Sequence, residues 1–249
     1  MAAGGGLLGG GGWEGSASQA PTAPELMFDL SIDTVRELNQ RLHDLAEPAR
    51  VLVRNPGGRH AIAAGLNAAH EVVIDGHVGY YCAGMNKHAH VRIAGNCATG
   101  VAENMMSGTV IVEGSASQSA GASAHGGLLV VRGDASARCG ISLKGGEIVV
   151  CGSVGHMSAF MAQSGCLVVL GDAGAALGDS LYEARIYVRG EVASLGADCI
   201  EKEMRAEHLE QLRDLLERAG VESVDPGEFR RYGSARRLYN FHVDNLGSY

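Results

Sequence analysis

The sequence is poor in aromatic residues, in proline and in positive charge, and each deficit excludes a class of protein. Only 5% of the residues are aromatic and 5 are proline, whereas 37 are glycine, so neither a collagen-like chain nor a proline-rich linker fits. The net charge of −8 argues against nucleic acid as a partner of the main body. No run of ~18 apolar residues is present, so we expect no membrane span.

The six cysteines form neither a Cys-x-x-Cys motif nor an evenly spaced framework. Scattered thiols of this kind are typical of a reducing compartment. The N-terminus has no basic region ahead of an apolar stretch, so no secretory signal is expected. Together these features predict a cytoplasmic protein.

Two helices are expected outside the central region. Residues 1–25 are rich in glycine and alanine and predict a disordered arm, either native or an added leader. Residues 26–50 form an N-terminal segment with a helix over 33–46, which Ser31 or Asp33 can cap. Residues 201–249 contain a second helix over 202–219 followed by a tail, with Gly220 as its C-cap. The apolar positions of the two helices are Val35, Leu38, Leu42 and Leu45, and Met204, Leu209, Leu212, Leu215 and Leu216.

Between them, residues 51–200 carry an internal repeat of 19 residues without insertion. Its marker is a glycine that follows a short apolar run and is expected at a turn, where the backbone has φ > 0 or approaches another strand closely. These glycines are Gly57, Gly76, Gly95, Gly114, Gly133, Gly152, Gly171 and Gly190. The first repeat, with LVRNP before Gly57, is degenerate, as a terminal repeat would be.

Two aliphatic columns precede the glycines, four and two residues before each one. Because strand side chains alternate between faces, the two columns share one buried face. The first column is Val72, Val91, Val110, Leu129, Ile148, Leu167 and Ile186, and the second is Ile74, Ile93, Val112, Val131, Val150, Val169 and Val188. A fixed period with no helix signal inside it predicts one solenoid coil per repeat, stacked about 4.8 Å apart.

The predicted fold is therefore an all-β solenoid: a single-stranded right-handed β-helix of seven to eight coils with flanking helices. Hexapeptide helices, calcium-binding nonapeptide repeats and leucine-rich repeats fit less well, because their periods or marker residues are absent. A third column, three residues before each glycine, should face outward, yet five of its seven members are aliphatic. Either the two helices cover this stripe or a partner does. The column is Val73, Arg92, Ile111, Val130, Val149, Val168 and Tyr187.

The G-x-G-x-G texture (GASAHGG at 121 and CGSVGHMSAFMAQSG at 151), the 19-residue coil and the appended C-terminal helix resemble the GXGXG β-helix family. That family includes the C-terminal domain of the glutamate synthase large subunit and one subunit of formylmethanofuran dehydrogenase. The stretches FDLS, NPGGRHAIAAGL and RRLYNF are similar to its stand-alone members, such as the β-helix subunit of N-methylglutamate synthase (methylamine–glutamate N-methyltransferase). The resemblance covers about residues 28–249.

The resemblance implies a non-catalytic structural subunit of a glutamate synthase-like enzyme, most simply N-methylglutamate synthase. Such a protein braces a glutamine amidotransferase-like subunit and an FMN-binding subunit that also carries an iron–sulfur cluster. No catalytic, cofactor-binding or metal-binding residue is then expected on this chain. The same role in a glutamate synthase proper, acting on glutamine and 2-oxoglutarate, is one alternative. An independent β-helix enzyme or carbohydrate-binding protein is the other, although no acidic or aromatic column marks a groove for it.

The C-terminal tail combines arginines with aromatic residues, which are common at protein interfaces. It is therefore expected to dock into an acidic groove of a partner subunit rather than onto nucleic acid, and deleting residues 228–249 should abolish co-purification. The expected interface residues are Arg230, Arg231, Arg236, Arg237, Tyr239 and Phe241.

Cysteine and histidine give weaker signals. Only Cys82 and Cys139 share a column, and they lie three coils apart, so no disulfide is expected and the thiols should be packed in the core. His88 and His90 have the spacing of a metal site, but no third ligand is evident, so a polar turn is the preferred interpretation.

Overall fold

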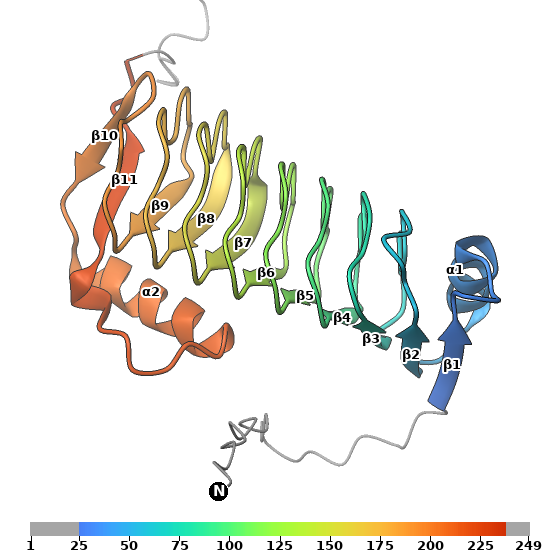
Figure 1. The fold of residues 1–249 in the computed structure, drawn as a ribbon. Coiled ribbons are helices and arrows are strands. Elements are labelled where there is room, and N and C mark those ends of the chain that lie inside the picture. Colours follow the sequence, from blue (N-terminus) through green and yellow to red (C-terminus); the bar gives the residue numbers. More distant parts are fainter. Residues whose placement is uncertain (1–24, 238–249) are drawn as a thin grey trace, which may run out of the picture.

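The computed structural model describes residues 25–237, and it confirms the predicted all-β solenoid (Figure 1). Its elements are β1 (Glu25–Asp29), α1 (Val35–Asp44), β2 (Arg50–Arg54), β3 (Glu71–Asp75), β4 (His90–Ile93), β5 (Thr109–Val112), β6 (Leu128–Val131), β7 (Lys144–Val150), β8 (Ser164–Val169), β9 (Arg185–Val188), β10 (Cys199–Lys202), α2 (Ala206–Arg218), η1 (Pro226–Glu228) and β11 (Arg230–Ser234).

One sheet runs along the whole rod. Its strands lie in the order β1 to β9, then β11 and β10, and every pair from β1 to β9 is parallel. From β3 to β9 each strand residue pairs with the residue 19 positions later, as in Val91 with Val110, apart from an irregularity at Lys144. The period found in the sequence is therefore the length of one coil.

The two predicted inward columns fill the core. Their members from β3 to β9 are at most 2% exposed. A second wall faces them across the coil, two residues after each column glycine, where single residues are bridged in parallel from coil to coil. This wall consists of Val78, Cys97, Ala116, Ala135, Val154, Ala173 and Val192. All but Val192 are buried, and they belong to the same hydrophobic core as the two columns.

The first coil departs from the predicted period. Val51 pairs with Val72, and Val53 with Ile74, so β2 lies 21 residues before β3 instead of 19. The repeat thus has an insertion of two residues here, and the prediction of an uninterrupted period is wrong for this coil. The position equivalent to Gly76 is Asn55, which has φ +53° because asparagine tolerates the left-handed region. Gly57 lies further along the turn.

The N-terminal end contains a strand that the sequence pattern did not predict. β1 pairs in parallel with β2. α1 connects these two strands and buries Leu38 and Leu42 in the main core. The N-cap of α1 is Thr34, which forms a capping box with Glu37, rather than Ser31 or Asp33. Both of those residues bond to Asp29 instead.

The C-terminal helix covers half of the outward column. Val130, Val149, Val168 and Tyr187 are fully buried beneath Leu212, Leu215 and Leu216 of α2. The explanation by self-coverage therefore holds for β6 to β9. It fails for α1, which caps the core instead. Val73 remains 38% exposed, and Arg92 lies in an ion pair with Glu113.

The chain then returns into the sheet. α2 begins at Ala206, later than predicted, because residues 199–202 form β10. It ends at Arg218, and its C-cap is Ala219 rather than the predicted Gly220, which follows with φ +62°. Residues 230–234 of the predicted docking tail form β11, which pairs antiparallel with both β9 and β10. This part of the tail belongs to the folded body, because its backbone completes the last coil.

Candidate functional site

The column glycines lie in the bends that follow the strands. Gly57 and Gly76 have positive φ, of +54° and +136°. At the later positions the reason for glycine is close approach. A Cβ at Gly95 would lie 2.6 Å from the carbonyl carbon of Gly76, and the Gly114 amide donates to the Gly95 carbonyl oxygen at 3.1 Å. Consecutive coils therefore touch backbone to backbone at this corner.

A ladder of polar side chains runs along the same corner, one residue after each column glycine. Each side chain except that of Glu191, the last, accepts a hydrogen bond from the backbone amide of the next residue in the ladder, for instance Asp134 Oδ1 from Ser153 N at 2.8 Å. The ladder is His77, Asn96, Ser115, Asp134, Ser153, Asp172 and Glu191. Ser153 separates the carboxylates of Asp134 and Asp172, whereas Glu191 follows Asp172 directly in the ladder.

The opposite edge of each coil is a turn that uses the left-handed backbone region at alternate positions. In the coils after β3 to β8, the residues five, seven and nine positions after the column glycine have positive φ. In the coil after β3 they are Tyr81, Ala83 and Met85, with φ of +59°, +53° and +57°. Non-glycine residues rarely adopt this region, at a cost of about 1–2 kcal/mol each. Bonds between coils, such as Met85 N to Glu103 O at 2.7 Å, hold them there.

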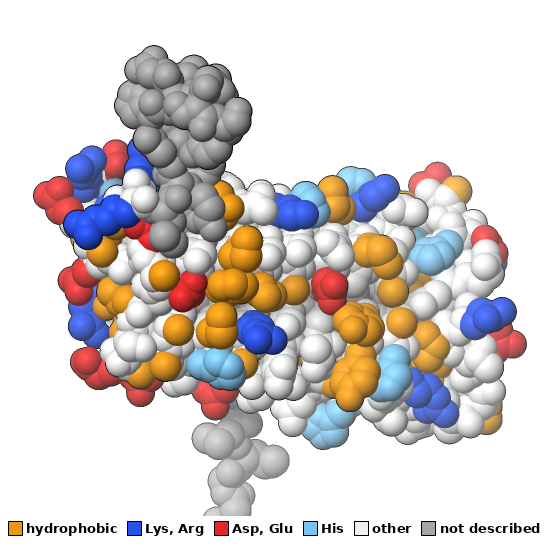
Figure 2. All heavy atoms as spheres, turned by 90° about the horizontal axis from the view of Figure 1, so that it is seen from above, with side chains coloured by type: hydrophobic (Ala, Val, Ile, Leu, Met, Phe, Trp, Pro, Cys, Tyr) orange, Lys and Arg blue, Asp and Glu red, His pale blue; other side chains and the backbone are white. Residues whose placement is uncertain are grey.

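Hydrophobic side chains gather on this edge, which we call the turn face and define as residues 4 to 11 positions after each column glycine, or after Asn55 in the first coil (Figure 2). Tyr80, Tyr81, Met85 and Met106 are 48%, 51%, 56% and 44% exposed, and Met161 is 36% exposed. The strand columns gave no indication of this surface. The signal available in the sequence was the pair of adjacent tyrosines in a chain with few aromatic residues.

The predicted interface arginines contact their own chain. Arg230 donates to the Gly190 carbonyl oxygen at 2.7 Å, and Arg231 to that of Glu203 at 3.0 Å. Arg236 forms an ion pair with Glu183, and the Arg237 amide donates to Asp198. Tyr239 and Phe241 lie outside the described residues. A partner interface at this end of the rod stays a prediction.

Five of the six thiols are buried, and none forms a disulfide. Burial raises the pKa of Cys97, Cys139, Cys166 and Cys199 to about 12. Cys151 is the partly exposed one, with its sulfur 3.9 Å from a guanidinium nitrogen of Arg132. Groups with such raised pKa values remain neutral thiols, which are poor nucleophiles and poor metal ligands.

The two histidines with the spacing of a metal site have separate surroundings. His88 contacts Ser107 in an exposed turn, and His90 begins β4. Within residues 25–237, no group of three or more His, Cys, Asp or Glu side chains could hold a metal ion. Over the same residues, no helix is long and apolar enough to cross a membrane.

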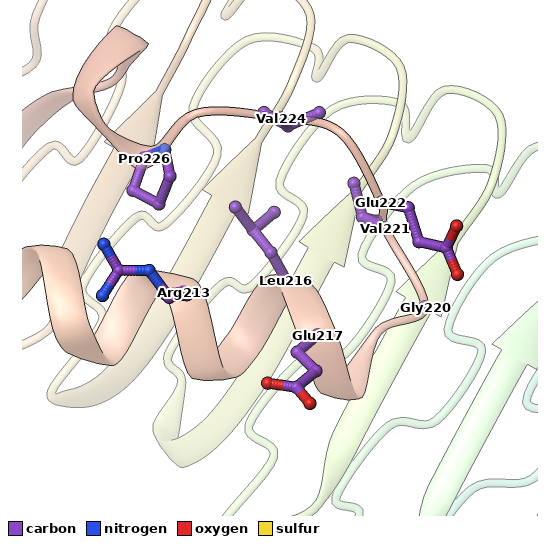
Figure 3. A pocket seen from close by; sticks show the side chains of 8 residues that line it. All are labelled: Arg213, Leu216, Glu217, Gly220, Val221, Glu222, Val224 and Pro226. Atoms are coloured by element: carbon purple, nitrogen blue, oxygen red, sulfur yellow. The ribbon is translucent and has the colours of Figure 1, made fainter. Parts of the chain in front are cut away.

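A hollow of about 200 Å³ lies beside the end of α2 (Figure 3). It is lined by the apolar side chains of Leu216, Val221, Val224 and Pro226, by Gly220, and by the charged side chains of Arg213, Glu217 and Glu222. It is a gap between the helix and the loop that follows it. The hollow lacks the set of polar groups pointing to one place that a ligand-binding site usually has, so we interpret it as imperfect packing at the surface.

One known protein is similar to this chain over nearly all of its length, although no family model matches. The chain is 59% identical over 226 residues to Protein GlxC of Rhizobium meliloti (strain 1021). The match spans 90% of this chain and 99% of that protein.

Proposed function

This chain belongs to the family of Protein GlxC, and on that premise we propose that it is a non-catalytic structural subunit of a glutamate synthase-like multi-subunit enzyme. In this proposal it braces a glutamine amidotransferase-like subunit and an FMN-binding subunit that carries an iron–sulfur cluster. The finer assignment we propose is N-methylglutamate synthase, which converts methylamine and glutamate to N-methylglutamate and ammonia.

The uniform solenoid core is the observation that carries the proposal. Aliphatic columns continue from β2 through β9, and both ends are built into the same sheet, by β1 with α1 and by β11 with β10. Such a rod can hold its two ends at a fixed separation, since every coil is hydrogen-bonded to the coils before and after it and α2 packs across the coils of β6 to β9. Fixed geometry between two bound subunits is what a scaffold supplies.

The buried polar groups support a structural role. His70 accepts from the Ala49 amide at 3.1 Å and contacts the Leu42 carbonyl oxygen at 3.0 Å, which fastens α1 to the first coils. Asn86 bonds both the amide and the carbonyl of Ala89. These groups satisfy backbone atoms at places where the chain bends, so they are engaged in maintaining the fold.

The test is to isolate the chain with its physiological partners and to characterise what binds it. The proposal expects a yellow-brown complex whose absorbance shows flavin and iron–sulfur bands and whose subunits include an amidotransferase. Methylamine-dependent formation of N-methylglutamate would support the finer assignment. Activity with glutamine and 2-oxoglutarate would replace it by a glutamate synthase proper. A colourless and solitary protein would refute the scaffold role.

A further inference from the structure

The turn face carries a compact group of residues at its N-terminal half, which we call the aromatic patch: His60, Tyr80, Tyr81, Met85, Glu103 and Met106. Ring contacts and backbone hydrogen bonds connect its members. The His60 and Tyr80 rings are stacked with centroids 4.5 Å apart and planes 1° from parallel. Tyr81 meets Tyr80 edge to face at 6.3 Å. Met85 donates its amide to the Glu103 carbonyl oxygen, and Met106 donates to Asn86 O.

A carboxylate lies directly beside the exposed ring of Tyr81. A Cβ placed on Gly100 would meet the Tyr81 ring at 2.6 Å and the Glu103 Oε2 atom at 3.0 Å, so ring and carboxylate come together over this glycine. Within residues 25–237 the structure places no cation on the Glu103 carboxylate, whereas Glu113, Glu147 and Glu228 all form ion pairs with arginine.

The chemistry of this patch fits an arginine side chain. A guanidinium stacks on tyrosine faces, and the same group pairs with a carboxylate at its edge. The two methionines are flexible and polarisable, so they can pack against the apolar stem of an inserted side chain and against the surface around it. Half-exposed tyrosines are among the residues that contribute most to binding at protein interfaces.

The arginine must come from another protein. Residues 1–24 and 238–249 lie outside the described part of the chain, and neither segment contains a lysine or an arginine. A second copy of this chain is disfavoured because each copy has a net charge of −8.

We therefore propose that the aromatic patch is the docking site for a partner subunit, which inserts an arginine between Tyr81 and Glu103. The inference rests on the proposed function, because it takes its partner from the glutamate synthase-like assembly. It adds the face of the rod that is used and the residue type that is recognised.

The experiment measures the affinity of the full-length chain for the purified amidotransferase-like and FMN-binding subunits. Tyr81→Ala should weaken binding to one of them by about tenfold or more, and Glu103→Gln by about fivefold with a reduced dependence on salt. Alanine is compatible with the backbone at position 81, since Ala176 occupies the equivalent place with φ +57°. Ile32→Ala, at an exposed apolar side chain (83%) outside both predicted interfaces, is the control and should change affinity less than about twofold.

A photocrosslinker in place of Tyr81 identifies the occupant. The expected product joins position 81 to an arginine-containing surface peptide of one partner subunit. Wild-type affinity in both variants, or crosslinks to residues 238–249 or to a second copy, would overturn the inference while leaving the scaffold role intact. If the unmodified chain binds neither subunit, the proposed function itself fails, and the docking site fails with it.

Discussion

At the scale of single residues, the contact between consecutive coils explains the glycine column. Gly95→Ala should lower the free energy of unfolding by about 1–3 kcal/mol, because its Cβ would overlap the Gly76 backbone. Urea unfolding checks this. Gly233→Ala is the control, since its nearest atoms are side-chain carbons of Lys202 at 3.6 Å and its φ is ordinary, and it should be close to neutral. Equal losses in the two variants would contradict the explanation.

The thiols give a prediction about reactivity and pH. At pH ~8 a thiol reagent should label Cys151 quickly and the other five only after unfolding, and Cys151→Ser should remove the fast phase. Burial raises the pKa of all five of these thiols above 9.0, and to about 12 for every one but Cys82, so the unfolded state releases protons first. The free energy of unfolding should therefore be unaffected by these groups below a pH of about 9 and fall as pH rises from there towards about 12. Cys139→Ala should make that fall shallower.

At the scale of elements, α2 decides which part of the sheet is buried. Val168→Ala, under α2, should lower the free energy of unfolding by about 2 kcal/mol. Val73 belongs to the same column but its side chain is 38% exposed, so Val73→Ala should lower it by well under half as much. Chemical unfolding of both variants tests this contrast. Similar values would mean that the helix adds little to the stability of the column.

The C-terminal tail contains both a strand and a segment that follows it. Deleting residues 228–249 would remove β11, so it would destabilise the last coil whether or not a partner is lost. Deleting residues 238–249 spares the strand and should weaken co-purification with the partner subunits while leaving the melting temperature unchanged. Full recovery of the complex with this shorter chain would refute an interface in the last twelve residues and leave the aromatic patch as the docking site.

The extent of prediction from sequence differs between elements for physical reasons. The columns at Val72 and Ile74 were predictable because one period fixes every coil at once. β1 was not, since its five residues occur before the repeat begins and only pairing with β2 makes them a strand. Thr34 was missed as the N-cap because Ser31 and Asp33 have side chains that can cap a helix equally well. The residue that becomes the cap depends on where the backbone enters the helix, which the sequence alone does not show. The exposed hydrophobic residues of the turn face do not recur at a fixed period. What recurs from coil to coil in this turn is the positive φ at alternate positions, and many residue types adopt it here.

At the scale of the whole molecule, the coil is the unit of construction. Removing residues 96–114 deletes one complete coil, including β5, and joins Gly95 to Ser115 in register. This shortened chain should fold with a slightly smaller denaturant dependence, because less surface is buried. Circular dichroism and urea unfolding provide the measurement. Deleting only residues 96–105 should destabilise the protein far more, since the shortened connection could no longer bring β5 into register with β4.

The 19-residue coil also constrains how such a protein can change over generations. A duplication or loss of 19 codons moves the two ends of the rod apart or together by about 4.8 Å and leaves both capped ends untouched. An insertion of any other length must be accommodated within its own coil, as the two extra residues between β2 and β3 are, and it does not lengthen the rod. The separation between the bound subunits can therefore evolve only in discrete steps, and lineages should differ in rod length by whole coils.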